Sequence, residues 1–239
     1  MERKKYAAVV LSAGKGTRMN SATPKQYLML AGKPVLYYSL HAFEKSMVDE
    51  IVLVTGRDEI GYCQKEIVEK YGFSKVKAVV AGGKERYHSV FCGLDELNKG
   101  KQPPDYVMVH DGARPFLDDG MIKRCAAAAE EFQACAAGMP MKDTVKIADP
   151  ALFAQETLER AYVWQIQTPQ AFMFPLIYHA YQELLEREQA GEVFPVTDDA
   201  MVLEVISGKK VKLVEGAYGN IKITTPEDLK LAEALLPAN

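Results

Sequence analysis

The sequence predicts an α/β protein with a mostly parallel, doubly wound sheet that is flanked by helices. Near-continuous apolar runs rich in Val and Ile recur along the chain, as in strands that are buried on both faces of a parallel sheet. Helical patterns separate these runs, and such alternation is typical of doubly wound folds with right-handed crossovers. The alternation breaks after about residue 138, which predicts an added feature in the second half of the chain.

The individual elements follow from the apolar runs and from helix-end signals. Pro34 suits the first turn of the first helix, and Gly72 suits the end of the second. Near the C-terminus, Thr225 is a suitable N-cap, with Pro226 at the first helical position. We expect strands at residues 7–12, 50–56, 75–83, 105–111, 211–216 and 220–225. We expect helices at residues 33–46, 58–72, 85–100, 118–132, 175–189, 198–207 and 225–236.

Residues 139–160 interrupt the alternation and are predicted to form a protruding β-hairpin arm. Two β-like stretches flank the sequence ADPA, which is typical of a turn. Because a long hairpin is only marginally stable alone in water, the arm should find a partner surface, and a second subunit is the natural candidate. The chain has no internal repeats or obvious linkers, so we expect residues 1–239 to form a single domain that carries this arm.

Composition limits the class of protein. The chain has 29 Lys and Arg against 32 Asp and Glu, a net charge of −3, which argues against a general nucleic-acid binder but allows a local cluster of cations around a small anion. The four cysteines are widely spaced without a CxxC pair, and we expect free thiols. The N-terminus does not resemble a signal peptide, and no apolar run approaches the ~18 residues that span a membrane. We therefore expect a cytoplasmic protein that binds neither nucleic acid nor membrane.

The loop LSAGKGTRMN, at residues 11–20, follows the first apolar run and predicts a phosphate-binding site. It lacks the GxxxxGK[ST] pattern, and Met19 stands where the dinucleotide pattern GxGxxG needs its third glycine. Its two glycines would still let backbone N–H groups approach an anion at a helix N-terminus. Lys15, Arg18 and Lys25 add three cations, which favours several phosphates over one. A tight turn with solvated Lys and Arg side chains explains the short motif equally well.

The stretch VMVHDGARPF places Asp111 at the end of another apolar run, where such sheets bind ligands. Mg²⁺ commonly binds through one or two carboxylates together with substrate phosphates, so Asp111 is a candidate metal ligand. Gly112 permits a close approach of a ligand to the backbone. Arg114 suits an anion site, but pairing with a structural carboxylate explains it better. His110 is better explained by packing or hydrogen bonding, because no cluster of His and Cys supports a transition-metal site.

Two further segments carry weaker signals. Gly82 and Gly83 end a predicted strand, where backbone groups can contact a base edge, and Ser89 can hydrogen-bond from the following helix. A capped helix explains these residues as well. Lys222 alternates with two isoleucines in the last predicted strand, so its side chain points to the opposite face. Such a lysine is usually solvated and gains a function only if that face lines the pocket.

Taken together, these motifs resemble the 2-C-methyl-D-erythritol 4-phosphate cytidylyltransferase family. The resemblance covers nearly the whole chain through the stretches LSAGKGTRM, PKQYL, AGGKERYHSV, VHDGARPF, KDTVK, TLERAYVWQIQTPQAF, TDDA and NIKITTPEDL, in this order. It implies a Rossmann-like nucleotidyltransferase fold and a β-arm that joins two subunits in a homodimer. It also implies transfer of CMP from CTP to the phosphate of methylerythritol phosphate, with release of pyrophosphate.

The resemblance implies roles for the residues that bind CTP. Arg18, Lys25 and Lys222 match catalytic cations that contact the phosphates, and Asp111 matches a carboxylate that binds Mg²⁺ or Mn²⁺. The positions that match the nucleotide-binding segments are Leu11, Ser12, Ala13, Gly14, Gly16, Gly82, Gly83, Lys84, Ser89 and Gly112.

The resemblance also implies roles for residues that bind the second substrate. Thr144 and Arg160 match arm residues that hold methylerythritol phosphate from the neighbouring subunit. Thr168 and Thr197 match positions that lie near the substrate or support the site. The attacking phosphate is already anionic, so no general base is required, in keeping with the absence of a hydrolase signature such as GxSxG.

The chain departs from the family pattern at two places, and three alternatives remain. The loop often begins with Pro-Ala, where this chain has Leu11 and Ser12, and the residue after the glycine pair is often acidic, where this chain has Lys84. Ribitol-5-phosphate cytidylyltransferases share several motifs, but the arm sequences favour the methylerythritol enzymes. A non-catalytic nucleotide sensor is disfavoured because the metal carboxylate and the cations are all present. A dinucleotide-dependent oxidoreductase is disfavoured because the third glycine and an acid after EIVLVTG are missing.

Overall fold

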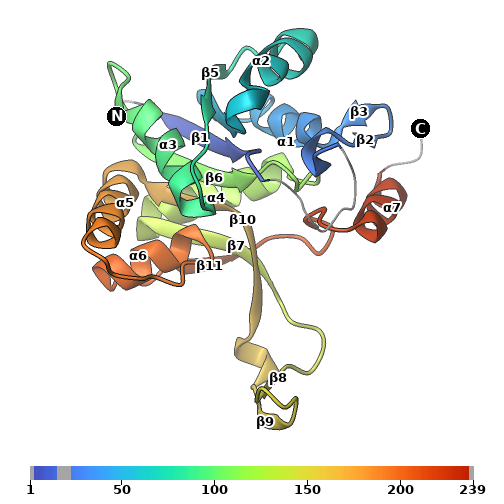
Figure 1. Ribbon diagram of the computed structural model, residues 1–239, viewed down its shortest axis with the longest axis vertical. Helices are drawn as coiled ribbons and strands as arrows, with labels where there is room; N and C mark the ends of the chain where they lie inside the picture. The colour runs from blue at the N-terminus through green and yellow to red at the C-terminus, as the bar shows by residue number, and fades with distance from the viewer. Residues whose placement is uncertain (1–2, 15–22, 237–239) are drawn as a thin grey trace.

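The computed structural model describes residues 3–14 and 23–236, and it consists of a central sheet with helices on both faces (Figure 1). Its seven strands lie in the order β11–β7–β10–β6–β1–β4–β5. Among them β10 pairs antiparallel with β6 and β7, and the other pairs are parallel, so the predicted mostly parallel α/β sheet is confirmed. The strands span Tyr6–Leu11 (β1), Glu50–Thr55 (β4), Val76–Ala81 (β5), Tyr106–Asp111 (β6), Ala134–Pro140 (β7), Trp164–Met173 (β10) and Lys212–Glu215 (β11).

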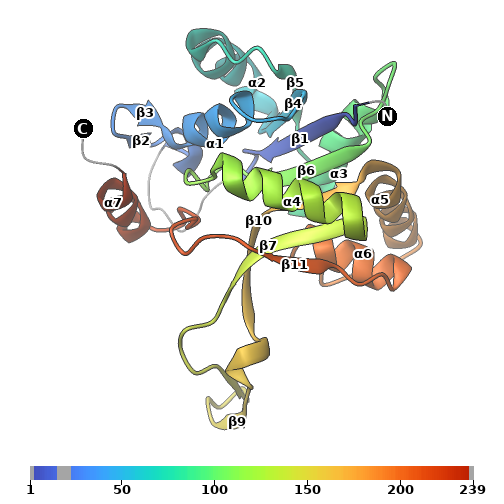
Figure 2. The ribbon, with the colours of Figure 1, turned by 180° about the vertical axis from the view of Figure 1, so that it is seen from behind.

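The helices cover the sheet because its strands are apolar on both faces. In β1, Ala8 and Val10 pack with α1 and α4, whereas Ala7 and Val9 pack with α3 and α5, and all four side chains are fully buried. The two helical layers are visible from opposite sides (Figures 1 and 2). The helices span Val35–Glu44 (α1), Ile60–Tyr62 (α2, continued by a π-helix at Cys63–Glu69), Arg86–Asn98 (α3), Asp119–Phe132 (α4), Phe174–Gln189 (α5), Asp199–Ser207 (α6) and Pro226–Leu235 (α7).

The helix-end signals are confirmed at Gly72, Thr225 and Pro226, which begins α7, and not at Pro34. Gly72 adopts φ +66° and ends the second helical segment, as predicted. Thr225 caps α7, and its side chain accepts a hydrogen bond from the backbone N–H of Asp228 at 3.4 Å. Pro34 instead lies just before α1, in extended backbone with ψ 147°, because it forms the short strand β3 (Lys33–Pro34) that pairs with β2 (Met29–Leu30).

The sheet also contains two strands, β7 and β10, that were not among those predicted from the apolar runs. β7 reads ACAAGMP, and its small residues carry no β-branched signal. β10 contains Gln and Pro residues, and its pairing with β7 shifts register between Ile166 and Gln170. The predicted strand at residues 220–225 is wrong. The Ile223 N–H donates to the Ala113 carbonyl at 2.9 Å, but no ladder follows, because the next two N–H groups, of Thr224 and Thr225, donate to the Asp228 carboxylate of α7.

The predicted arm extends away from the sheet beyond the ends of β7 and β10 (Figures 1 and 2). Within it, β8 (Lys146–Ala148) pairs antiparallel with β9 (Ala154–Thr157). The turn between them is closed by Asp149, whose carboxylate accepts hydrogen bonds from the N–H groups of Ala151 and Phe153. Four large apolar side chains of the arm are exposed: Ile147 at 47%, Leu152 at 86%, Phe153 at 70% and Tyr162 at 79%.

Two further expectations from composition can be compared with the structure. The cysteines are free, with Cys63, Cys125 and Cys135 buried and Cys92 half-buried, as predicted. Within residues 3–14 and 23–236, no helix combines the length and the apolar character that crossing a membrane requires.

The position of β10 in the interior of the sheet, between β7 and β6, yields a stability prediction. Phe172 of β10 is fully buried, so Phe172→Ala should lower the free energy of unfolding by about 3–5 kcal/mol through lost burial and a cavity. Val193 is 91% exposed, so the control Val193→Ala should stay within about 0.5 kcal/mol of the parent chain. Urea unfolding measures both, and a loss below about 1 kcal/mol for Phe172→Ala would contradict this packing.

Candidate active site

The site lies between the parallel strands β1 and β6, where the order in which strands are added to the sheet reverses. β1 pairs with β4 on one side and with β6 on the other, so the loops that leave β1 and β6 diverge at their carboxyl ends. Open α/β sheets bind ligands in the crevice that such a divergence creates. Leu11 ends β1 directly opposite Asp111, the last residue of β6. The loop and the carboxylate singled out in the sequence are therefore neighbours in space.

Two cavities meet at this point and share one wall. The first cavity has a volume of about 450 Å³, and the second has a volume of about 250 Å³. Arg86, Asp111 and Lys222 line both. The first cavity is also lined by Leu11, Ser12, Ala13, Gly14, Lys25, Gln26, Gly83, Lys84, Glu85, Ser89 and Ala113. The second is also lined by Arg114, Ile166, Gln167, Thr168, Gln170, Thr197 and Asp198.

The first cavity brings together most of the predicted nucleotide-binding residues. The backbone N–H of Ser12 donates to the Val54 carbonyl at 2.7 Å, and the side-chain amide of Gln26 donates to the Ser12 carbonyl at 2.7 Å. These bonds fix the start of the loop against β4 and against the short 3₁₀ turn Lys25–Tyr27. Gly16 and Arg18 of the same predicted site lie outside the described residues.

The glycine pair after β5 closes the cavity from the other side. A Cβ atom on Gly82 would lie 2.7 Å from the Ala13 Cβ and 2.7 Å from the Ser89 Oγ. The Ser89 hydroxyl in turn accepts a hydrogen bond from the Gly83 N–H at 3.1 Å. Gly82 is therefore required for the close approach of two loops, and Lys84 adds an exposed cation at the rim.

Asp111 lies at the centre of a cluster of charges. Its Oδ2 accepts from the Lys222 ammonium at 2.8 Å and lies 3.6 Å from the Arg114 Nε, and its Oδ1 accepts from the Arg86 Nε at 3.4 Å. Burial raises the pKa of the Asp111 carboxyl, but the fields of Arg86, Lys222 and Arg114 outweigh burial and hold that pKa well below its usual range. Lys222 thus faces the site despite the absence of a strand, and Arg114 pairs with a carboxylate as expected.

A hydrogen-bond chain behind Asp111 fixes its backbone. The His110 Nε2–H donates to the Arg114 carbonyl at 3.2 Å, so its Nδ1 accepts from the Thr168 hydroxyl at 3.0 Å. The Thr168 oxygen accepts from the Asp111 N–H at 3.1 Å. Burial lowers the pKa of His110 to about 4, so the ring is neutral at pH 7. His110 is a structural residue, as expected, and Thr168 supports the site as well as lining the second cavity.

The remaining predicted residues lie elsewhere. Gly112 lines neither cavity. Its N–H donates to the Leu11 carbonyl at 2.8 Å, and an added Cβ would lie 2.7 Å from the Leu36 side chain. The glycine therefore allows a close approach of other protein atoms and not of a ligand. Thr197 is exposed at the rim of the second cavity. Thr144 and Arg160 lie on the exposed arm, where Arg160 donates to the Lys142 carbonyl at 2.9 Å, and they line neither cavity of their own chain.

Sequence reasoning missed the residues that hold Asp111 from the side of α3. Arg86 forms a bidentate pair with Asp199, with N···O distances of 2.9 and 2.8 Å, and the Tyr181 hydroxyl donates to Asp199 at 2.5 Å. Gln170 was missed as well, although its amide joins β10 to Asp198, the N-cap of α6, at 3.0 Å. The two adjacent acidic residues of TDDA, just before a predicted helix, could have indicated an ion pair. Nothing in the sequence, however, identifies Arg86 as the partner of Asp199.

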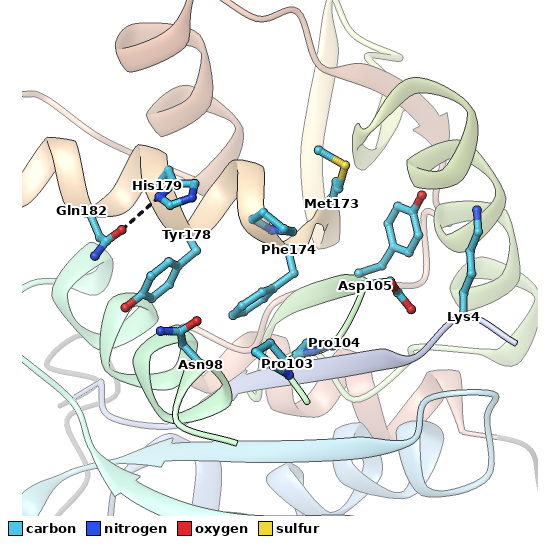
Figure 3. Close-up of a pocket in the computed structure, with 12 residues that line it drawn as sticks. Lys4, Asn98, Pro103, Pro104, Asp105, Met173, Phe174, Tyr178, His179 and Gln182 are labelled. Atoms are coloured by element: carbon cyan, nitrogen blue, oxygen red, sulfur yellow. Dashed lines mark hydrogen bonds between the residues drawn. The ribbon is translucent and has the colours of Figure 1, made fainter. Parts of the chain in front are cut away.

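A larger cavity shares no lining residue with this site (Figure 3). It has a volume of about 630 Å³ and lies at the start of β6, at Asp105 and Tyr106, whereas Asp111 ends that strand. Prolines and aromatic rings line much of it, and His179 and Gln182 bond to each other at its edge at 3.1 Å (Figure 3). The charged cluster at Asp111 therefore marks the candidate active site better than cavity size does.

The chain matches one family of known proteins over nearly its whole length. A family model described as 2-C-methyl-D-erythritol 4-phosphate cytidylyltransferase matches residues 6–238. A relative of that name from Lachnoclostridium phytofermentans is 48% identical over 232 residues, covering 97% of this chain and 96% of the relative. One from Caldanaerobacter subterraneus is 46% identical over 231 residues, covering 96% and 98%.

Solved structures agree with the sequence comparisons. The crystal structure of 4-diphosphocytidyl-2C-methyl-D-erythritol synthase from Anaerococcus prevotii superposes with a TM-score of 0.81 at 35% identity, covering 97% of this chain and 95% of that chain. The cytidylyltransferase structure from Thermus thermophilus has a TM-score of 0.74 at 28% identity, covering 97% and 98%. The fold, the charged site between two cavities and these matches agree, and the chain belongs to the 2-C-methyl-D-erythritol 4-phosphate cytidylyltransferase family.

Proposed function

We propose that the chain transfers CMP from CTP to 2-C-methyl-D-erythritol 4-phosphate, giving 4-diphosphocytidyl-2-C-methyl-D-erythritol and pyrophosphate. The observation that carries this proposal is the wall of Arg86, Asp111 and Lys222, which the two cavities share. A transfer between two bound phosphates needs two adjacent sites with cations at their junction, and this wall supplies them. The ribitol-5-phosphate and non-catalytic alternatives are not favoured by the comparisons, because the reported relatives are methylerythritol phosphate cytidylyltransferases.

The reaction is an in-line displacement at phosphorus. A phosphate oxygen of the acceptor attacks the α-phosphorus of CTP, a new P–O bond forms, and the bond to the β-phosphate breaks as pyrophosphate leaves. The attacking oxygen is anionic, so no proton has to be removed. The site agrees with this requirement, because His110 is buried and both of its ring nitrogens are engaged in hydrogen bonds. Charge stabilisation and positioning are the main contributions left to the protein.

The cations of the site have different roles in stabilising charge and positioning the substrates. In our proposal the loop from Leu11 to Gly14 and Lys25 contact the triphosphate, and Arg18 belongs to the same group by the family resemblance. Lys222 lies at the junction, with 35% of its side chain exposed, and stabilises charge on the α-phosphate. Asp111 keeps the Lys222 ammonium in place until phosphate oxygens compete for it.

A divalent cation, Mg²⁺ or Mn²⁺, is part of the proposal. Among the described residues no group of three or more His, Cys, Asp or Glu is arranged to hold a metal ion, so these residues offer no metal cage of their own. Asp111 fits as one carboxylate ligand of an ion that takes its other ligands from the triphosphate and water, provided that Lys222 gives up part of its contact. Such an ion, held by Asp111, would act as a Lewis acid and would neutralise charge that builds up on the leaving pyrophosphate.

We also propose a homodimer in the cytoplasm, with each arm completing the site of the other subunit. Thr144 and Arg160 match substrate-binding positions, yet they line neither cavity of their own chain. The exposed Leu152, Phe153 and Tyr162 give the arm an apolar surface of the kind that a second protein surface covers.

The cation assignments predict large losses in turnover. Lys25→Ala and Lys222→Ala should each lower kcat by ~10²–10³-fold, because each removes a charge that stabilises the transition state. Lys70 pairs with Glu66 on the surface, so Lys70→Ala is a matched control that should retain wild-type turnover. Steady-state pyrophosphate release measures all three, and near-normal kcat in both site variants would contradict the assignment.

The contact between Gly82 and Ala13 predicts an effect on CTP binding. Gly82→Ala should weaken CTP binding by at least about tenfold, because the added methyl group displaces the loop that contacts the nucleotide. Gly61 has no atom within 4 Å of an added Cβ and lies in a helix, so Gly61→Ala should bind CTP normally. Calorimetric titration with CTP distinguishes the two, and equal affinities would exclude the proposed role of this contact.

The arm proposal predicts complementation between two inactive variants. Subunits with Arg160→Ala and subunits with Lys25→Ala are each expected to be inactive. After mixing and verified subunit exchange, half of the dimers are mixed and one of their two sites is intact, so about one quarter of wild-type turnover should return. If activity does not return, the arm does not act across the dimer.

A further inference from the structure

Arg86 occupies the junction of the two cavities and contacts two carboxylates at once. Its Nη1 and Nη2 atoms donate to Asp199 at 2.9 and 2.8 Å, and its Nε donates to Asp111 at 3.4 Å. The side chain is 29% exposed, and it lines both cavities. An ion pair with a purely structural role would not need to face both cavities.

The anchor of Arg86 is buried and fully engaged. Asp199 has no exposed surface, and the Tyr181 hydroxyl donates to its Oδ1 at 2.5 Å. Asp199 is the first residue of α6, whose N-cap Asp198 accepts from the Met201 N–H at 2.9 Å. The helix start therefore fixes the Asp199 carboxylate, and that carboxylate fixes the guanidinium.

We propose that Tyr181, Asp199 and Arg86 form a positioning unit that holds Asp111, and through it the Lys222 ammonium, between the nucleotide and the acceptor phosphate. This inference rests on the proposed transfer reaction and goes beyond it by assigning a role to Arg86 and to Asp199 and Tyr181, which line neither cavity. Charges alternate along Asp199, Arg86, Asp111 and Lys222, so Arg86 and Asp111 each lie between two groups of opposite charge. Tyr181 and Asp199 act through Arg86.

The geometry also explains why arginine stands at this position. The planar guanidinium places two N–H groups on Asp199 and directs a third toward Asp111. A lysine has a single point charge and cannot hold both carboxylates in fixed directions. Without the third contact Asp111 can rotate, and an error of about 1 Å in the position of a reacting or stabilising group can cost ~10²-fold in rate.

The test compares four variants with a matched ion pair elsewhere. Arg86→Lys, Arg86→Met and Asp199→Asn should lower kcat by ~10- to 100-fold and change the KM for CTP much less, because they disturb the junction and leave the triphosphate loop intact. Tyr181→Phe removes one hydroxyl and should give a smaller loss, about 3- to 10-fold in kcat. The control is Glu192→Gln, which breaks an exposed bidentate pair with Arg187 on α5 and should leave kcat unchanged.

A double-mutant cycle separates positioning from general structural damage. If Arg86 and Asp199 act as one unit, adding Asp199→Asn to Arg86→Met should lower kcat by less than about twofold further. Independent contributions would multiply, and that outcome would overturn the proposal. A wild-type kcat in folded Arg86→Lys and Asp199→Asn would also overturn it. Should Asp199→Asn not fold, an unchanged kcat in Tyr181→Phe overturns it equally. Turnover by the unmutated chain in the same assay tests the assigned reaction separately from this proposal.

Discussion

The carboxylate of Asp111 is the contact on which the rest of the site depends. It joins the end of β6 to the start of α3 through Arg86 and to the segment before α7 through Lys222. Its backbone is fixed from β10 by Thr168. Four parts of the chain thus converge on one buried anion at the point where the loops of a doubly wound sheet diverge, and both cavities open beside it.

Such a cluster of buried charges adds little to the free energy of unfolding, which favours a functional reason for its presence. Taking charges out of water is unfavourable, and a buried ion pair often contributes less to stability than apolar packing of equal volume. Here three cations surround Asp111: Arg86 and Lys222 lie on the shared wall, and Arg114 lines the second cavity. The arrangement favours additional anionic oxygens, and it is preorganised because every charged group already has a fixed partner.

The sequence predicts the parts of this structure that arise from local pattern and leaves out those that arise from distant pairing. Apolar runs located β1, β4, β5, β6 and β11, and alternation placed Lys222 on the opposite side from its neighbouring isoleucines. The small residues of β7 and the polar residues of β10 carry no such pattern, because their burial is decided by the sheet around them. Arg86 and Asp199 are 113 residues apart, so no local spacing could join them. The roles of Thr144 and Arg160 rest on family resemblance, since the arm is exposed in a single chain.

The most direct test of the account is pyrophosphate release from CTP in the presence of a divalent cation, with methylerythritol phosphate and ribitol 5-phosphate as parallel acceptors. We predict release with methylerythritol phosphate and none with ribitol 5-phosphate or with CTP alone. Release with ribitol 5-phosphate only would keep the fold and the chemistry of the shared wall but contradict the assigned acceptor. If protein that binds CTP releases no pyrophosphate with methylerythritol phosphate and none with ribitol 5-phosphate, the result would contradict the transfer reaction itself and favour a nucleotide-binding role.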